Sequence, residues 1–579
     1  MKKLFIVFII LAIFAAPVLA RDIYVAKDGS DDTGDGTIGN PYLTITYGKN
    51  QMAAGDVLII KSGTYTENVY TSQNGTADAW FTFKANPGDT VVIDGTFTLG
   101  SWDSAQASYI RVEGLTITGE VYGHYGSWWE FINNTFGRNL AIAANSGADG
   151  GAHDVIIRSN RFIYDGTDGG IVITQTGTKT YNVLYENNLF DHNSNCDIFR
   201  PFGHDLIIRG NEIVGMDEGG FHADFTQIYD SNGEQSYNVL IEGNYVHDSS
   251  GSISMLQNRE GVVNHSHWTW RNNLFVRVGQ VAQASMPYVI WENNLFYDTG
   301  HNTDGPILLR AEAIDLDTHD YGWSHDVTIL NNIFIGCASY PGQEDTGYYS
   351  WTDGIDATTP NINFTADYNY VSKGPDYNYE GKLEFNEPNG VNGGQPYFVD
   401  EANADFHYTD QSPFVDKGVT RPDFAFDFDG VARPQGSAWD IGPYEYASGE
   451  DVLPPTISNG KPTGTVSCTS NPEDVIISVD TNEFASCKWD QLDIDYASMT
   501  HTFATTGGIG HSTPIADLAC GQEHTFYVRC QDQNGNANTT SYVVQFTIAE
   551  EGQAPTGMQV YTYNGSLVTY NGTLVGEPR

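Results

Sequence analysis

An asparagine that returns in one local context constrains this chain more than any other sequence feature. Each of these asparagines is followed two places later by Phe, Ile or Val, and most are preceded by a β-rich run such as DVIIRSN or NVLIEGN. The intervals run from about 21 to about 38 residues, the range in which a repeat indicates a stacked solenoid. Because the unit is rich in strand residues and lacks helical apolar spacing, the sequence predicts a parallel β-helix. The repeating residues are Asn134, Asn160, Asn188, Asn211, Asn244, Asn273, Asn294, Asn332 and Asn369.

Each asparagine is expected to hold the same place in successive coils. Neighbouring coils lie about 4.8 Å apart, so equivalent side chains form columns. An asparagine in a tight turn tolerates the left-handed backbone conformation, and its amide can donate to one neighbour and accept from the other. The apolar residue two places on would point inward and build an apolar stack. We therefore assign these asparagines a structural role.

The order of segments predicts an all-β protein with two folded domains. Residues 1–20 carry two lysines and an apolar run ending in small residues, which is typical of a signal peptide. A parallel β-helix solenoid with a C-terminal capping segment is expected over 21–447 and a linker over 448–455. A small immunoglobulin-like or fibronectin-like β-sandwich is expected over 456–549, followed by a tail over 550–579. We expect a secreted, extracellular or periplasmic monomer without a transmembrane segment.

The charge balance limits the partners of the chain. Acidic residues number 73 against 27 basic residues, for a formal net charge of -46. This excess argues against nucleic acid, because phosphate binding needs clustered Lys and Arg. It is compatible with calcium sites, which need several carboxylate oxygens, although most of the charge is expected to solvate the surface.

The six cysteines divide into two groups. Four fall together near the C-terminus, where export favours two disulfides: Cys468, Cys487, Cys520 and Cys530. Three pairings are open, and Cys487 with Cys530 and Cys468 with Cys520 is the preferred one. Cys196 and Cys337 lie in the solenoid about five coils apart, roughly 24 Å and beyond disulfide reach. These two are predicted to stay reduced and buried.

The first coils carry a more specific pattern. Residues 28–68 contain a leading DGS, then GT, NP and a Thr-Ile pair, and finally a GD, a strand and SGTYTEN. This run resembles the start of secreted right-handed β-helix proteins, namely the pectate lyases and the group of chondroitinase B and alginate lyases. The resemblance implies a right-handed parallel β-helix and a polysaccharide as substrate. In the second domain, TFYVRCQDQNGNAN resembles the late strands of bacterial immunoglobulin-like modules.

One outer face of the solenoid gathers the candidate site residues. The strands that follow the asparagine turns include GIVITQT, CDIFRPFGHD, GFHADFTQIY and SISMLQNREG, and apolar alternation aligns them on neighbouring rungs. Three arginines, a histidine and several amides on one face are unusual in so acidic a chain. The candidate catalytic residues are His222, Arg200 and Arg259, the candidate substrate-binding residues are Asp224, Gln227, Gln257 and Arg310, and Gln283 lies on the same face.

This set of side chains suits β-elimination of a glycan that contains uronic acid. Arg200 and Arg259 would neutralise the uronate carboxylate, which acidifies the C5 proton, and His222 would remove that proton. The paired-Asp calcium motif and the downstream lysine base of some pectate lyases are not found in the sequence, so the expected base is a histidine. A calcium ion is expected to be held by Asp217, Glu218 and Asp197, with Asp224 as an alternative.

Two other functions remain open at this point. An inverting glycoside hydrolase would need two carboxylates about 6.5–9.5 Å apart, and Asp217 or Glu218 with Asp224 would supply them. A glycan-binding or surface-structural solenoid would instead use exposed aromatic rings such as Trp128, Trp129 and Trp351. Elimination creates a double bond that absorbs in the ultraviolet, hydrolysis creates only reducing ends, and binding creates neither.

Overall fold

The computed structural model describes most of the solenoid and the second domain. The described residues are 20–101, 106–143, 152–164, 170–175, 180–217, 223–228, 235–250, 254–257, 265–279, 281–299, 307–309, 325–337, 350–351, 363–372, 387–422, 424–447, 454–466, 468, 472–483, 485–507, 510–532, 534–550, 559–563 and 566–570. Within these residues, no helix reaches the length and apolarity needed to cross a bilayer. The predicted signal peptide lies almost wholly outside them.

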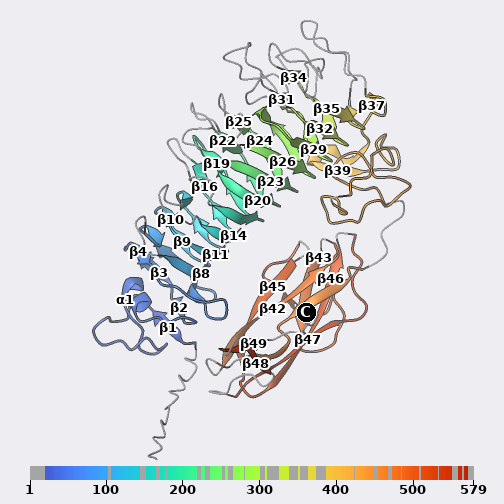
Figure 1. Ribbon diagram of the computed structural model, residues 1–579. Helices are drawn as coiled ribbons and strands as arrows, with labels where there is room; N and C mark the ends of the chain where they lie inside the picture. Colours follow the sequence, from blue (N-terminus) through green and yellow to red (C-terminus); the bar gives the residue numbers. More distant parts are fainter. Residues whose placement is uncertain are drawn as a thin grey trace, which may run out of the picture.

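Three long parallel sheets wind around one core, as the repeat predicted (Figure 1). The first sheet has thirteen strands: β1 (Asp22–Val25), β2 (Val57–Ile60), β5 (Phe81–Ala85), β8 (Ala107–Glu113), β11 (Gly126–Ile132), β14 (His153–Arg158), β17 (Tyr181–Glu186), β20 (Gly203–Arg209), β23 (Ser236–Glu242), β26 (His265–Arg271), β29 (Val289–Glu292), β32 (Val327–Leu330) and β35 (Phe364–Asp367).

The second sheet has eleven strands: β4 (Val69–Thr71), β7 (Phe97–Leu99), β10 (Val121–Gly123), β13 (Leu140–Ala143), β16 (Gly170–Gln175), β19 (Asp197–Pro201), β22 (Thr226–Ile228), β25 (Ser254–Gln257), β28 (Ala282–Ser285), β31 (Ile307–Leu309) and β34 (Ser350–Trp351). Each strand pairs in parallel with the equivalent strand of the next coil.

The third sheet again has thirteen strands: β3 (Gly63–Tyr65), β6 (Val91–Ile93), β9 (Thr116–Ile117), β12 (Thr135–Phe136), β15 (Arg161–Phe162), β18 (Leu189–Asp191), β21 (Glu212–Val214), β24 (Tyr245–Ser249), β27 (Leu274–Val278), β30 (Leu295–Tyr297), β33 (Ile333–Ile335), β36 (Tyr370–Val371) and β37 (Val391–Asn392). The short helix α1 (Ile45–Asn50) packs on the first coils.

The predicted asparagine column is continuous through all nine residues. Each side-chain Nδ2 donates to Oδ1 of the next asparagine over 2.9–3.1 Å, from Asn134 to Asn369. At the end, Glu387 takes the place of a tenth asparagine and accepts from both Nδ2 and the backbone N–H of Asn369. The apolar residues two places on are buried and stack, as in Phe162 on Phe190 at 4.6 Å.

One detail of the turn differs from expectation. The left-handed backbone conformation belongs to the residue before each column asparagine, for example Asn133, Asn187 and Asn272, with φ between 51° and 55°. The column asparagines themselves do not appear among the residues with positive φ in the described part of the chain. The residue before each column asparagine therefore takes the left-handed turn, and at two coils it is a glycine, Gly210 or Gly243.

The segment after the last coils packs on their flank. In the third sheet, the outward column is polar at Thr116 and Thr135 and becomes apolar at Leu274, Leu295 and Ile333. These apolar residues form one buried cluster with Phe406, Tyr408, Phe414, Ile441 and Tyr444 of the terminal segment. This segment contains β38 (Phe398–Asp400), the short 3-10 helix η2 (Glu401–Asn403) and β39 (Asp405–Tyr408). The sequence-based expectation had placed it over the open end of the solenoid, whereas these described contacts lie on the side.

A histidine held between two carboxylates fastens this segment. His407 Nδ1 lies 2.5 Å from Asp405 Oδ1, and its Nε2 lies 2.5 Å from Asp429 Oδ2. Burial alone would lower the pKa of His407, but the hydrogen bonds and charges of Asp429 and Asp405 raise that pKa to about 9. An unfolded histidine titrates near pH 6.5.

We therefore expect the stability of the chain to fall with rising pH in a defined window. The contribution of protonated His407 is fully present below about pH 6.5 and is lost as the pH rises through about 9. The free energy of unfolding, measured with urea between pH 6 and 10, should decline less steeply in His407→Gln than in the wild type. Equal slopes for the two proteins would contradict this assignment.

The second domain is a sandwich of two sheets. One contains β40 (Ile457–Lys461), β42 (Glu473–Thr481) and β45 (Gly510–Leu518). The other contains β41 (Gly464–Val466), β47 (Tyr542–Ile548), β46 (Glu523–Asp532), β43 (Ala485–Asp490) and β44 (His501–Thr502), and both sheets share one core. In the tail, β48 (Gln559–Tyr563) pairs with β49 (Ser566–Tyr570).

The cysteines pair as preferred from the sequence. Disulfides join Cys468 to Cys520 and Cys487 to Cys530, and the second of these links directly opposed residues of β43 and β46. Cys196 and Cys337 are buried thiols in the solenoid. The two disulfides fit an oxidising compartment.

Candidate functional site

Arg200 stands on the outer face of the second sheet. Its neighbour Phe199 belongs to the solenoid core, so the alternation of β19 turns Arg200 outward. The Nε of Arg200 donates to Asp197 Oδ2 over 2.7 Å. Only 15% of the Arg200 side chain and 2% of the Asp197 side chain are exposed. The buried carboxylate of Asp197 therefore fixes the position of the Arg200 guanidinium at the surface.

The next coil repeats this arrangement with an amide. Phe199 and Thr226 are Cα partners, which places Gln227 directly beside Arg200 on the neighbouring rung. Gln227 Nε2 donates to Asp224 Oδ2 over 3.0 Å, and the backbone N–H of Asp224 donates to Asp197 Oδ1 over 3.1 Å. Each of the two coils thus presents one polar side-chain end, Arg200 or Gln227, and an aspartate three residues earlier binds it.

Asp197 and Asp224 are two buried carboxyl groups in adjacent coils, and their closeness affects the pKa of Asp197. Burial, and then the nearby charge of Asp224, raise the pKa of Asp197 to about 6, although Arg200 acts in the opposite direction. Asp224 is completely buried. Two adjacent buried carboxylates favour an additional cation or a proton, which is common at functional sites.

The same face continues across later coils. The backbone register extends the column of Arg200 and Gln227 through Met255 and Gln283. Gln257 lies two residues beyond Met255 and opposite Ser285, so it occupies a neighbouring column of the same sheet. The backbone register therefore puts these residues on successive strands of the second sheet.

The remaining candidates are distributed differently. Asp217 lies beside Ser194 in the turn that precedes the second sheet, is exposed, and accepts from Ser250 Oγ over 3.0 Å. Four predicted site residues lie outside the described part of the chain: His222, Arg259, Arg310 and Glu218. The described core of the site therefore consists of Arg200, Gln227 and their two aspartates.

Two aromatic candidates for sugar stacking have other roles. Trp129 is buried in the core, and its Nε1 donates to Ala107 O over 2.7 Å. Trp128 is 38% exposed, but one face of its ring is stacked on Tyr109 at 4.6 Å between centroids. Trp351 belongs to β34, and its side chain lies outside the described atoms.

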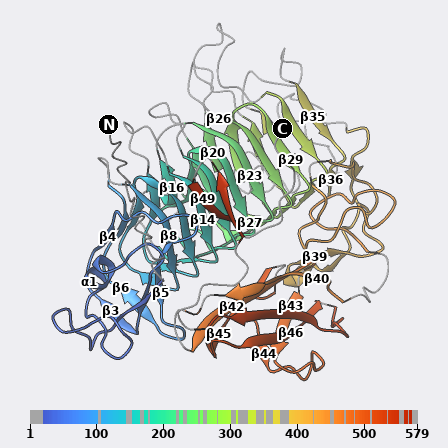
Figure 2. The same cartoon turned by 60° about the horizontal axis from the view of Figure 1, so that its bottom comes forward.

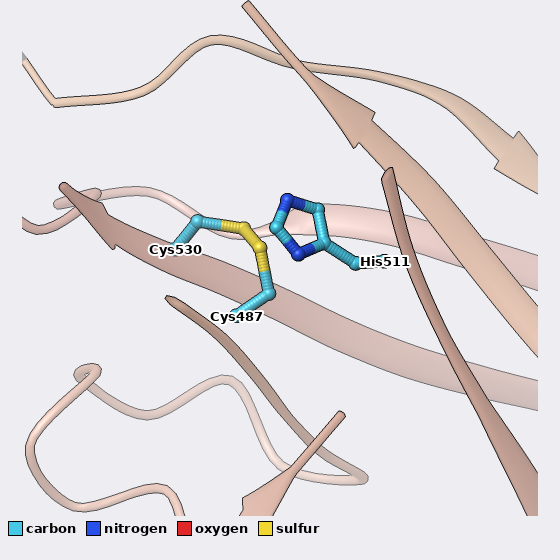
Figure 3. Close-up of side chains that lie close together, drawn as sticks. All are labelled: Cys487, His511 and Cys530. Atoms are coloured by element: carbon cyan, nitrogen blue, oxygen red, sulfur yellow. A yellow bond between two sulfur atoms is a disulfide. The ribbon is translucent and has the colours of Figure 1, made fainter. Parts of the chain in front are cut away.

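A possible metal centre in the second domain proves to be a disulfide. Among the described residues, one group of three ligating side chains lies close enough to hold a metal ion: Cys487, His511 and Cys530. Figure 3 shows that the two sulfur atoms are bonded to each other beside the imidazole. His511 Nε2 and Nδ1 lie 2.9 and 3.0 Å from the hydroxyls of Thr481 and Thr506. Burial lowers the pKa of His511 to about 4, so the ring is neutral and structural.

The pairing of Asp197 with Asp224 was not anticipated from the sequence. The signal was present, since DIFR at 197–200 and DFTQ at 224–227 repeat an aspartate three residues before a polar head group. The sequence alone had suggested Asp197 as a metal ligand, and Asp224 as a substrate ligand or an alternative metal ligand. The structure brings the two together as the supports of Arg200 and Gln227.

Part of the chain is similar in sequence to a pectate lyase. No protein-family model matches the chain. The chain is 35% identical over 147 residues to pectate lyase PEL9 of Emericella nidulans, which covers 24% of this chain and 34% of that protein. It is 34% identical over 73 residues to the uncharacterized protein YwoF of Bacillus subtilis, covering 13% of this chain and 15% of that protein.

Among solved structures, pectate lyase Pel9A matches with a TM-score of 0.36 and 16% identity, covering 74% of this chain and 97% of that one. The chain thus spans about a third or less of the length of the curated relatives it matches. By sequence it is similar to a pectate lyase, and by its own strand pairing it is a parallel β-helix.

Proposed function

We propose that this chain is a polysaccharide lyase that cleaves a glycan containing uronic acid by β-elimination. The observation that carries the proposal is Arg200, which buried Asp197 fixes on the outer face of the second sheet beside Gln227. The similarity to a pectate lyase supports the same class of substrate. We also propose that the chain is secreted as a monomer and that its C-terminal sandwich has an immunoglobulin-like fold.

The chemistry follows from the position of the guanidinium. A uronate carboxylate that meets Arg200 loses much of its negative charge, so the C5 proton becomes more acidic. A base takes that proton, and the electron pair of the C5–H bond forms the double bond between C4 and C5. The C4–oxygen bond breaks, and the departing oxygen keeps its electron pair and takes up a proton from water. Because Asp197 already orients Arg200, little side-chain entropy is lost when the substrate binds. Gln227 offers hydrogen bonds to the neighbouring sugar.

The base and the outer substrate contacts rest on sequence alone. We assign His222 as the base and Arg259 as a second carboxylate ligand, with Gln257 and Arg310 as contacts to the flanking sugars. His222→Ala should lose lyase turnover while keeping the far-ultraviolet circular dichroism spectrum of the wild type. Unchanged turnover in a folded His222→Ala protein would remove this residue from the mechanism.

Calcium is a further part of the proposal. The stacked carboxylates of Asp197 and Asp224 are donors of the kind that calcium prefers, and their crowding favours a divalent cation. Asp217 and Glu218 would hold the ion together with Asp197 or Asp224. A bound calcium ion would help neutralise the substrate carboxylate.

One assay separates the lyase from its alternatives. The full chain is incubated with polygalacturonate, alginate, a glycosaminoglycan and a neutral glycan, each with and without a chelator. We expect ultraviolet absorbance to rise with at least one anionic polymer. New reducing ends without absorbance would instead show a glycoside hydrolase, for which Asp217 or Glu218 with Asp224 would supply the carboxylates. Binding without either product would show a glycan-binding protein.

A further inference from the structure

A hollow lies on a different sheet of the solenoid from Arg200. It has a volume of about 470 Å³ and lies over β23, β26, β29 and β32 of the first sheet, strands that run side by side in both views (Figures 1 and 2). Its floor consists of Leu240, Thr269, Ile290 and Thr328, which are Cα partners in successive coils. A volume of this size is in the range of small-ligand sites.

The floor belongs to an outward column that changes character along the solenoid. Near the N-terminus the column carries Val57 and Thr82 and then the ion pair of Arg111 and Glu130. From Ile156 onward the outward residues are Ile156, Leu184, Ile207, Leu240 and Ile290, with threonines between and after the last two. The outer face of a secreted β-helix has no need of this aliphatic row for its own core, because the inward residues of the same strands already fill that core.

One wall of the hollow presents ring edges and polar groups. His267 and Tyr288 occupy neighbouring coils and stack at 4.5 Å, and Tyr288 is 43% exposed. Asp326 continues the same column and accepts from Asn363 Nδ2 over 2.9 Å. Hydrogen-bonding groups therefore recur at the coil spacing along this side.

The opposite wall carries charged side chains that are paired in salt bridges. Arg271 Nε donates to Glu242 Oε1 over 2.7 Å, and Arg421 Nε donates to Glu292 Oε2 over 2.6 Å. Arg271 and Glu292 line the hollow, and each is paired with a residue outside the lining, Glu242 and Arg421 respectively. Asp326 on the other wall adds a negative charge. A uronate chain would meet net repulsion here, in contrast to the Arg200 face.

We propose that this hollow binds a neutral oligosaccharide, as a glycan-binding site separate from the lyase site. Aliphatic and threonine side chains on the floor suit the C–H faces of pyranose rings, and the polar walls suit their hydroxyls. The regular spacing of the walls, about 4.8 Å per coil, suits a linear polymer that lies along the solenoid axis. Such a site would hold the protein on neutral glycan while the second sheet works on the anionic one.

The test measures binding of defined probes to the full chain. Cellohexaose, xylohexaose, mannohexaose and hexagalacturonate are titrated by calorimetry into the wild type, Ile290→Arg and Ile156→Arg. Ile156 shares the outward column but lies outside the lining of the hollow, so it is the matched control. We expect at least one neutral hexaose to bind the wild type, with Kd raised tenfold or more in Ile290→Arg and unchanged in Ile156→Arg.

Thermal unfolding of each variant checks that the fold is kept. Arg200→Ala separates the two sites, because it should leave the neutral hexaose bound while weakening hexagalacturonate. The proposal is overturned if none of the three neutral probes binds, or if Ile290→Arg and Ile156→Arg change their binding equally.

Discussion

Asn244→Ala should destabilise the solenoid by about 3–6 kcal/mol, because it breaks the asparagine column in the middle. Asn244 Oδ1 accepts from both the backbone N–H and the Nδ2 of Asn211, and its own Nδ2 donates to Ile208 O and Asn273 Oδ1. Truncation removes the acceptor of the Asn211 backbone N–H and of one Nδ2 hydrogen of Asn211, whose other Nδ2 hydrogen still bonds Tyr185 O, and it removes the side-chain donor to Ile208 O. Each of these three losses costs about 1–3 kcal/mol. Urea unfolding followed by tryptophan fluorescence measures the change in the free energy of unfolding.

Asn238→Gly is the matched control for this variant. Asn238 also belongs to β23, but its side chain is exposed and donates only over 3.2 Å to Asp205 in the described contacts. Glycine keeps the left-handed backbone, with φ of 54° at this position. We expect a change of less than about 1 kcal/mol. Similar losses in both variants would mean that the column contributes no more than a surface amide.

Arg200→Ala should lower kcat/KM on the cleaved polymer by at least about 100-fold. The lost interaction is a charge-assisted one that strengthens as the carboxylate of the substrate takes up charge, and such groups contribute about 10²–10³ in rate. Arg200→Lys should recover only part of the activity, because a lysine cannot keep both the bond to Asp197 and a forked contact to a carboxylate. Initial rates of ultraviolet absorbance measure both variants.

Arg209→Ala provides the control for the loss of a paired arginine. Arg209 also forms an ion pair with a glutamate, Glu186, but it lies on the first sheet and 44% of its side chain is exposed. Its removal should leave kcat/KM within about twofold, since exposed ion pairs contribute little. A comparable loss in Arg209→Ala would point to general destabilisation rather than to a site at Arg200.

The fold followed from the sequence because one column repeats in every coil. The spacing of Asn134, Asn160 and their successors placed equivalent residues above one another, and the apolar residue two places on completed the core. The doublets such as Asn187-Asn188 concealed which residue takes the left-handed turn. The flank packing of the terminal segment was also missed, although the change from Thr135 to Leu274 in the outward column signals it.

The sequence predicted only those features of the site that depend on strand register. Apolar alternation was enough to bring Arg200 and Gln227 to one face, because Phe199 points inward. It did not show that Asp197 and Asp224 stack, since Asp197 is the first residue of β19 and Asp224 lies two residues before β22, where the apolar alternation is not yet established. The hollow over Leu240 and Ile290 depends on side-chain shape across four coils, which a one-dimensional pattern does not contain.

The most direct test of the site is a crystal structure of the full chain soaked with trigalacturonate or trimannuronate, using Arg200→Lys if the wild type cleaves the sugar. We expect a uronate carboxylate within hydrogen-bond distance of residue 200, with Gln227 contacting the adjacent sugar. An oligouronate bound elsewhere on the chain, with residue 200 untouched, would contradict the assignment of this face as the lyase site.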